Sequence, residues 1–279
     1  MTATQVTNIT LNNGITIPQL GFGIWQVEQN QTQSLVEHAI EIGYRHIDGA
    51  AAYGNERELG QAIAATNVPR EELFITTKLW NADQGYDTTL KAFETSMGKL
   101  GLNYLDLYLI HWPMPTEGRY AETWRAFEQL RGDGRVRAIG VSNFRVQDLQ
   151  HLMRDFDVVP AINQIELHPR FQQTELREFH RQNGIATQAW SPLGHGELLA
   201  NSTITAIADA HDVSPAQVLI RWHLDEGNIL FPKASSRERI SQNFDVFGFS
   251  LSGDEIARID ALGNDERRTG PDPDTFTGL

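Results

Sequence analysis

Short apolar runs that alternate with amphipathic segments predict an α/β fold, a (β/α)₈ (TIM) barrel. The chain has 279 residues and 40% hydrophobic content, which is enough to bury one sizeable core. Segments with apolar residues at every third or fourth position predict helices between the runs. Eight strands alternating with helices fit a closed barrel better than an open sheet, and we expect a single domain over residues 1–279. The runs are residues 20–23, 44–47, 73–77, 104–110, 136–141, 161–165, 185–189 and 229–231, and the helical segments include 32–42, 88–100, 120–130, 146–153 and 174–183.

The two ends of the chain depart from this alternation. Residues 7–18 contain two short β runs around Asn12, Asn13 and Gly14, which tolerate the positive φ of a tight turn. They predict an N-terminal β-hairpin. Residues 263–279 are rich in Asp, Pro, Gly and Thr and predict an irregular C-terminal tail.

An open dinucleotide-binding sheet is the main alternative fold. It requires a Gly-x-Gly-x-x-Gly motif between a strand and a helix. The nearest candidate, residues 21–26, lacks the third glycine and continues into polar residues. The sequence therefore favours the barrel.

Composition excludes several classes of function. The formal net charge of −13 makes nucleic acid and anionic membranes poor partners. The absence of cysteine excludes disulfides and thiolate chemistry. The first residues have no secretory signal, so we expect a cytoplasmic protein. No paired His and carboxylate spacing predicts a metal site, and we expect no metal.

Polar and aromatic side chains follow the predicted strands, at the end of a barrel where active sites are built. Taken singly, each has a structural explanation: Asp48 as a turn residue, Tyr53 as a half-buried anchor, Lys78 as a paired buried cation, His111 as a core histidine. Their occurrence at successive strand ends favours a shared site. The further residues at strand ends are Ser142, Asn143, Gln164, Trp190, Ser191 and Lys233.

The first four of these residues suggest proton transfer without a metal. A free tyrosine has a pKa near about 10, which is too high for efficient acid–base catalysis at neutral pH. We expect the Lys78 ammonium to lower the pKa of Tyr53, and Asp48 to keep that ammonium charged. Tyr53 would then donate a proton to a carbonyl oxygen, and His111 would hold that oxygen as a neutral donor.

Ordered blocks of sequence resemble the aldo-keto reductases over nearly the whole chain. The blocks are residues 20–25, 43–48, 52–56, 74–80, 105–113, 139–144, 163–166, 231–233 and 251–254. Residues 159–169 and 219–224 look most like bacterial 2,5-diketo-D-gluconate reductase-type members. The resemblance implies a barrel that reduces small aldehydes or ketones with NADPH. We expect a monomer; a cofactor-bound regulatory or structural barrel without turnover is the alternative.

The resemblance also implies roles for individual residues. Asp48, Tyr53, Lys78 and His111 match the catalytic tetrad of the family. The residues that match cofactor contacts are Ile24, Asp48, Ser142, Asn143, Gln164, Trp190, Ser191, Leu193, Lys233, Ser235, Arg239 and Asn243. Those that match the substrate pocket are Phe22, Trp25, Trp80, His111 and Trp112.

Three positions depart from the family pattern. Gly49 stands where Thr or Ser is more common, and we expect it to loosen the loop that carries Tyr53. Ala234 replaces a common Ser beside Lys233, and Gln242 replaces a frequent Glu. Because Ser235 and Ser236 are available to compensate for Ala234, we expect the preference for NADPH to be retained.

Overall fold

The computed structural model describes residues 6–263 and 268–278. Its strands are β1 (Asn8–Thr10), β2 (Thr16–Pro18), β3 (Phe22–Gly23), β4 (His46–Asp48), β5 (Phe74–Leu79), β6 (Leu105–Ile110), β7 (Val136–Ser142), β8 (Ile162–Glu166), β9 (Ala186–Trp190) and β10 (Ile229–Leu230). Its helices are α1 (Gln29–Ile42), α2 (Glu56–Ala65), α3 (Tyr86–Leu100), α4 (Tyr120–Gly132), α5 (Val146–Asp155), α6 (Thr174–Gln182), α7 (Ser202–His211), α8 (Pro215–Asp225), α9 (Arg237–Phe244) and α10 (Gly253–Asp260).

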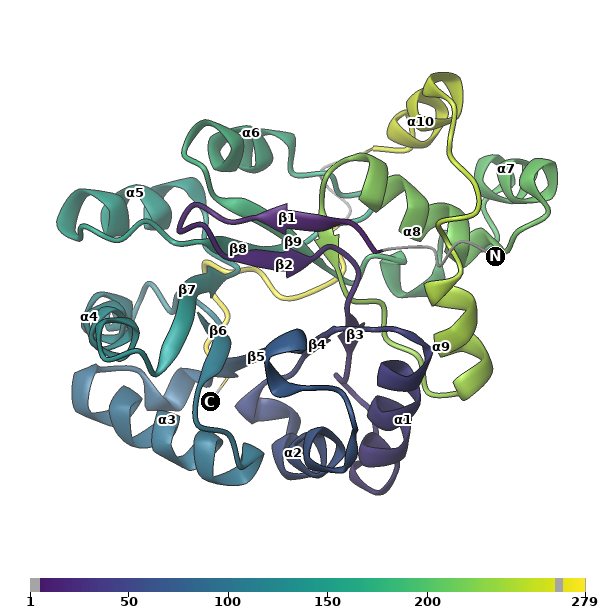
Figure 1. Ribbon diagram of the computed structural model, residues 1–279. Helices are drawn as coiled ribbons and strands as arrows, with labels where there is room; N and C mark the ends of the chain where they lie inside the picture. Colours follow the sequence, from purple (N-terminus) through teal and green to yellow (C-terminus); the bar gives the residue numbers. More distant parts are fainter. Residues whose placement is uncertain (1–5, 264–267, 279) are drawn as a thin grey trace.

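The eight strands β3 to β10 form one parallel sheet in chain order. Parallel bridges join Leu20 to Leu230 and Gly23 to Lys233, so the last strand lies beside the first. The backbone N–H of Gly21 also donates to the carbonyl of Leu230 at 2.7 Å. These contacts close the sheet, and helices surround it (Figure 1). The predicted TIM barrel is confirmed.

The two ends of the barrel are covered by different segments. The predicted hairpin is confirmed: β1 and β2 pair antiparallel and lie across the end that faces the viewer in Figure 1. The yellow C-terminal segment runs behind the barrel in the same view. Residues 268–278 contain neither helix nor strand, as expected for the tail, while residues 264–267 and 279 of the predicted tail lie outside the described residues.

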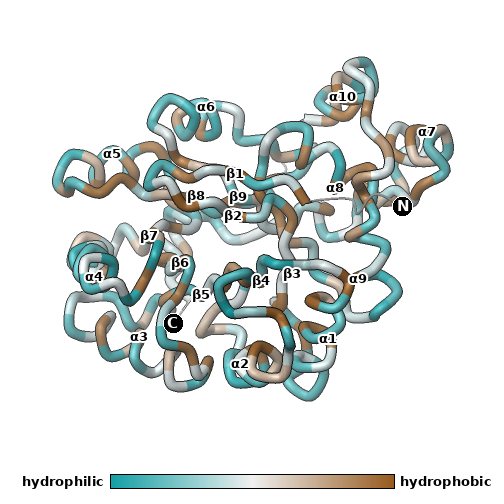
Figure 2. The backbone as a smooth tube through the Cα atoms, viewed as in Figure 1, coloured by the Kyte–Doolittle hydropathy of each residue, from teal (hydrophilic) through white to brown (hydrophobic). Residues whose placement is uncertain are grey.

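The hydrophobic core lies mainly between the barrel and its helices. Every residue of β5 and β6 is buried, and the ring of Tyr108 stacks on Phe127 of α4 with centroids 4.5 Å apart. The helices turn apolar positions toward the strands, as the brown segments of the tube indicate (Figure 2). Among the described residues, no helix has the length and apolar character that crossing a membrane would require. In contrast to the apolar core, the inside of the barrel contains buried polar side chains, which form the site described next.

Candidate active site

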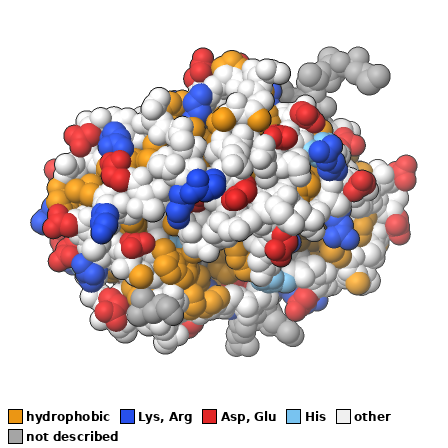
Figure 3. Space-filling model, turned by 90° about the horizontal axis from the view of Figure 1, so that it is seen from below, with side chains coloured by type: hydrophobic (Ala, Val, Ile, Leu, Met, Phe, Trp, Pro, Cys, Tyr) orange, Lys and Arg blue, Asp and Glu red, His pale blue; other side chains and the backbone are white. Residues whose placement is uncertain are grey.

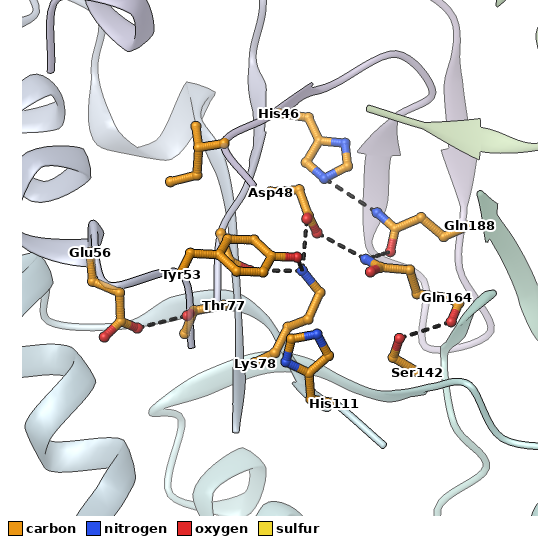
Figure 4. Close-up of polar contacts among 12 residues, drawn as sticks. His46, Asp48, Tyr53, Glu56, Thr77, Lys78, His111, Ser142, Gln164 and Gln188 are labelled. Atoms are coloured by element: carbon orange, nitrogen blue, oxygen red, sulfur yellow. Dashed lines mark hydrogen bonds and ion pairs between the residues drawn. The ribbon is translucent and has the colours of Figure 1, made fainter. Parts of the chain in front are cut away.

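Asp48, Tyr53 and Lys78 are brought together at the ends of β4 and β5. The Lys78 ammonium donates to Asp48 Oδ2 at 2.7 Å, to the Gly49 carbonyl at 2.9 Å and to Tyr53 Oη at 3.1 Å (Figure 4). Lys78 is fully buried and Asp48 is 1% exposed. A buried ammonium requires such partners because it has lost its hydration. The three residues therefore form one hydrogen-bonded cluster, as their strand-end positions predicted.

The loop that carries Tyr53 is held from both sides. Tyr53 ends a short 3₁₀ turn, Ala51–Tyr53, and Gly54 follows it with a φ of 75°. The buried amide of Asn55 donates to the carbonyls of Ile24 and Val27 at 3.0 and 3.2 Å. On the other side, Thr77 donates to the buried carboxylate of Glu56 at 2.7 Å. The small residues of the loop therefore lie between two firm attachments.

The pKa of Tyr53 differs in direction from the sequence-based expectation. Burial raises the pKa of Tyr53 above its ordinary value, and the opposing effect of the Lys78 ammonium does not outweigh it. The negative charge of Asp48 also raises it, because it disfavours the phenolate. The expectation of a lowered pKa is therefore wrong. Tyr53 stays a protonated phenol, the form that donates a proton.

The pKa of Lys78 shifts in the expected direction. Burial by itself lowers the pKa of Lys78, but the charge of Asp48 and the hydrogen bonds of Asp48 and Tyr53 together raise it above the ordinary value. The side chain is therefore an ammonium at neutral pH. Its charge is directed at one carboxylate oxygen and one phenol oxygen.

His111 stands next to the phenol and is uncharged. Its ring meets the rings of Tyr53 and Trp80 edge to face, with centroids 5.9 and 5.2 Å apart. Burial, together with the nearby Lys78 charge, lowers the pKa of His111 well below its ordinary value. A neutral imidazole beside a protonated phenol provides two candidate donors for one substrate oxygen.

A cavity of about 900 Å³ opens above this cluster. Hydrophobic side chains gather around a hollow near the lower edge of the view in Figure 3, while charges of both signs are scattered over the rest of that face. The predicted site residues that line the cavity are Trp25, Asp48, Tyr53, Trp80, His111, Trp112, Ser142, Asn143, Gln164, Trp190, Ser191, Leu193, Lys233 and Arg239. The structure therefore gathers most of the predicted site around one space.

Part of the cavity wall is fixed by unusual backbone conformations. Asn143 has a φ of 65°, and its side-chain oxygen accepts from Trp190 Nε1 at 2.8 Å. Gln26, Ser191 and His195 also have positive φ and line the same cavity. Strained backbone of this kind is concentrated at ligand sites in many proteins.

Five predicted site residues do not line the cavity: Phe22, Ile24, Lys78, Ser235 and Asn243. Lys78 lies just below it, bonded to Asp48 and Tyr53, which do line it. Phe22 and Ile24 are fully buried in the hydrophobic core, where Phe22 packs against Tyr44. Neither side chain reaches the cavity, and their expected roles in the substrate pocket and the cofactor site stay predictions. Ser235 precedes α9 and Asn243 lies within it, and both are outside the cavity lining. Ser236 accepts from the backbone N–H of Arg239, so its hydroxyl caps α9.

Glu166 is a residue whose role was missed in the sequence. Its carboxylate accepts from the backbone N–H of Thr269 at 2.7 Å, from that of Gly270 at 3.0 Å, and from the Thr269 hydroxyl. His168 contacts the same carboxylate at 3.2 Å. These hydrogen bonds lower the pKa of Glu166 to about 2, although burial opposes them. A carboxylate directly after the predicted buried strand 161–165 was the available signal, since a buried charge needs partners.

Glu166 thereby fixes the tail as part of the cavity wall. Gly270 lies against the Trp190 ring so closely that a Cβ atom would overlap it. Farther along, Asn81 donates to the Thr277 carbonyl at 2.9 Å, and Phe276 packs on Trp112 with centroids 4.4 Å apart. The tail residues that line the cavity are Thr269, Gly270, Pro271 and Phe276.

The departures from the family pattern have small structural consequences. A Cβ on Gly49 would lie 3.3 Å from both Leu59 Cδ2 and the Thr76 carbonyl oxygen. The Gly49 N–H donates to that same carbonyl at 2.9 Å, so the backbone itself holds this loop. Ala234 is buried in the core. The expectation that Gly49 loosens the loop therefore finds no support in the contacts of this loop.

An eight-stranded barrel with a buried carboxylate and ammonium and a half-buried phenol and imidazole at its strand ends defines the class of this protein. The model of the Aldo/keto reductase family matches residues 19–264, and the chain belongs to that family. Within the described ranges, no group of three or more His, Asp or Glu side chains is arranged to hold a metal ion.

Individual relatives cover almost the whole chain. An aldo-keto reductase of Mycolicibacterium smegmatis is 56% identical over 268 residues, which are 96% of this chain and 97% of the relative. The glyoxal reductase of Bacillus subtilis is 50% identical over 267 residues, with 95% and 96% covered. A variant of Gox0644 crystallised with NADPH superposes with a TM-score of 0.94 at 46% identity, covering 98% of this chain and 99% of that chain.

Proposed function

We propose that this protein reduces small aldehydes or ketones to alcohols, using NADPH as the hydride donor and Tyr53 as the proton donor. The observation that carries the proposal is the position of Lys78 Nζ, which contacts Asp48 Oδ2 and Tyr53 Oη at once. This cluster faces a cavity that is large enough for a nicotinamide and a small carbonyl compound. The NADPH complex of Gox0644 and the glyoxal reductase of Bacillus subtilis support the same activity.

The cavity lining fits a nicotinamide dinucleotide phosphate. At one end, Lys233 and Arg239 supply cations for a phosphate group, despite the acidic character of the chain. Near the cluster, the Trp190 ring is held by Asn143 and offers an apolar surface for an aromatic ring. Gln164, which is bonded to Asp48, also lines the cavity and provides polar atoms for a carboxamide. When bound, NADPH supplies the hydride.

The residues of the chain handle the proton. As the carbonyl becomes an alkoxide, its oxygen takes the proton from Tyr53 Oη. The Lys78 ammonium, 3.1 Å away, stabilises the phenolate that remains. Asp48 keeps that ammonium charged and in place. Neutral His111 offers a second donor that orients the carbonyl oxygen without competing for the proton.

The substrate end of the cavity favours uncharged compounds. It is formed by Trp25, Trp80, Trp112 and Phe276. The cations Lys233 and Arg239 belong to the cofactor end of our proposal. Small aldehydes and dicarbonyl compounds therefore fit better than keto acids, including 2,5-diketo-gluconate, which carries a carboxylate.

Replacing Tyr53 by Phe tests the proposal. NADPH oxidation is followed by absorbance with a panel of simple aldehydes, α-keto aldehydes and keto sugars. We expect Tyr53→Phe to lose roughly 10³-fold in turnover, in the range for a lost general acid, while NADPH binding stays within about threefold. Tyr104→Phe, which keeps its ring under Arg70, is the matched control and should retain full turnover. Unchanged turnover in Tyr53→Phe would overturn the mechanism.

The same assay decides between a reductase and a cofactor-bound barrel without turnover. The complete hydrogen-bonded cluster favours the reductase. Arg239→Gln should raise the Kd for NADPH about tenfold and leave the Kd for NADH unchanged, because only NADPH carries the additional phosphate. Wild-type protein that binds NADPH but reduces none of the carbonyl compounds in the panel would favour the non-catalytic alternative.

A further inference from the structure

A chain of buried polar side chains continues from the active site into the barrel. Gln164 on β8 and Gln188 on β9 are direct neighbours in the strand register. The amide nitrogen of Gln164 donates to Asp48 Oδ1 at 2.9 Å and to Gln188 Oε1 at 3.1 Å (Figure 4). Gln164 is 2% exposed and Gln188 is fully buried. Both N–H groups of Gln164 are therefore engaged inside the barrel.

His46 lies at the far end of this series of buried side chains, and its tautomer sets the direction of the hydrogen bonds. His46 is fully buried, and burial lowers its pKa to about 3, so its ring is neutral. His46 Nδ1 lies 3.2 Å from the carbonyl oxygen of Pro18, which only accepts hydrogen bonds, so Nδ1 carries the proton. His46 Nε2 is then an acceptor, and it faces the amide nitrogen of Gln188 at 3.5 Å. The ring fits only because position 21 is glycine, where a Cβ would lie 2.6 Å from Nδ1.

These contacts fix the orientation of both amides. Since His46 accepts from the nitrogen of Gln188, the oxygen of Gln188 is left to face Gln164. Since Gln188 and Asp48 both accept from the nitrogen of Gln164, the oxygen of Gln164 is left free. Among the described residues nothing donates to that oxygen, and Gln164 lines the cavity. One contact to Asp48 would permit the amide to rotate about it, whereas two contacts hold its plane.

We propose that Gln188 is a positioning residue that aims Gln164 Oε1 at the carboxamide NH₂ of the nicotinamide. The inference rests on the proposed use of NADPH. A carboxamide NH₂ only donates, so it needs an acceptor at this point of the wall. Loss of the Gln188 contact leaves one N–H of Gln164 without a partner and allows its amide to turn. Gln188 therefore acts on cofactor binding without touching the cofactor.

The test compares NADPH with reduced 3-acetylpyridine adenine dinucleotide phosphate, in which a methyl group replaces the carboxamide NH₂. Binding to the full chain is measured by calorimetry and by quenching of tryptophan fluorescence. We expect wild type to bind NADPH about tenfold more tightly than the analogue. Gln188→Met should bind NADPH about tenfold more weakly than wild type and the analogue within twofold of wild type. Gln188→Asn, which keeps an amide but withdraws it from Gln164, should show the same loss and serves if Gln188→Met does not fold.

Two further variants separate positioning from a general structural effect. Gln19→Met removes another buried glutamine, which donates only to the carbonyls of Leu224 and Asn228, and should leave both affinities unchanged. In a Gln164→Leu background, Gln188→Met should cause no additional loss of NADPH affinity, because it acts through Gln164. Equal weakening of NADPH and the analogue by Gln188→Met, an equal loss in the Gln164→Leu background, or no loss at all would overturn the inference. Wild type that binds neither nucleotide would instead contradict the proposed function.

Discussion

The floor of the cavity and its tail wall are built in different ways. The floor, defined here as Asp48, Lys78 and Gln164, consists of strand residues whose side chains bind one another across the barrel. The tail wall, residues 268–278, has no regular structure and is attached mainly through side chains of other segments, chiefly Glu166, Asn81 and Trp112. The residues of the proposed reaction are thus held by the sheet, whereas the substrate end of the cavity is shaped by a tail that a few separate side-chain contacts hold in place.

This difference predicts which kinetic parameter each region controls. Changes in the floor should lower kcat, because they disturb groups that act in the transition state. Changes in the attachments of the tail wall should raise KM, because they alter a surface that contacts the substrate equally before and during reaction. The predictions below test this division, beginning with the largest effect.

Lys78→Met should have the largest effect. It removes the cation that binds both Asp48 and Tyr53, and it leaves the Asp48 carboxylate buried without its partner. We expect a loss of kcat on the order of 10³ or more, and a decrease in the free energy of unfolding of about 3 kcal/mol. NADPH oxidation and thermal unfolding measure the two quantities. Lys91→Met, at an exposed position on α3, is the control; a Lys78→Met enzyme that retains a substantial part of its kcat would show that the floor is not where the proton is managed.

Glu166→Gln should affect the tail wall and spare the floor. A glutamine at this position meets the N–H groups of Thr269 and Gly270 with an NH₂ group in place of one oxygen. Losing hydrogen bonds to a charged group costs about 1.5–3 kcal/mol, so we expect substrate KM to rise roughly tenfold while kcat changes by less than about threefold. Glu197→Gln, which removes a more exposed carboxylate that pairs with Arg170, should change neither parameter. A fall in kcat equal to the rise in KM would contradict the division between floor and tail wall.

Wild type and Glu166→Gln should also differ in how their stability depends on pH. The pKa of Glu166 is about 2 in the folded chain, below its ordinary value, so unfolding raises the affinity of this group for protons. Its contribution to stability is complete well above the unfolded pKa of about 4.3 and is lost as the pH falls toward 2. The Tm difference between wild type and Glu166→Gln should therefore be constant near neutral pH and shrink steadily below about pH 4. A difference that grows in acid would mean that the carboxylate is not the group that holds the tail.

The sequence predicted the floor better than the tail wall, and the reason is physical. The barrel places the ends of successive strands on one rim, so Asp48, Lys78 and His111 follow from their order along the chain. The burial of Phe22 could not be predicted because β3 has only two residues, too few for alternation to show which face a side chain takes. The contacts of Glu166 with Thr269 and Gly270 join residues about one hundred positions apart, and no local pattern predicts them. The pKa of Tyr53 depends on the balance of burial and two opposite charges, and this balance follows from distances that the sequence does not give.

Gly49→Ser should have the smallest effect and tests how much the floor depends on its loop. The new Cβ would lie 3.3 Å from both Leu59 Cδ2 and the Thr76 carbonyl oxygen. The end of the Leu59 side chain can yield by a few tenths of an ångström, and the backbone at Thr76 needs only a similar small shift. The Gly49 carbonyl would still accept from Lys78, so Tyr53 should keep its position. We expect kcat to stay within about twofold and the free energy of unfolding to change by about 0.5 kcal/mol or less, measured by turnover and denaturant unfolding. A severalfold gain in kcat would show instead that the glycine does loosen the loop, and that the floor owes part of its rigidity to this position.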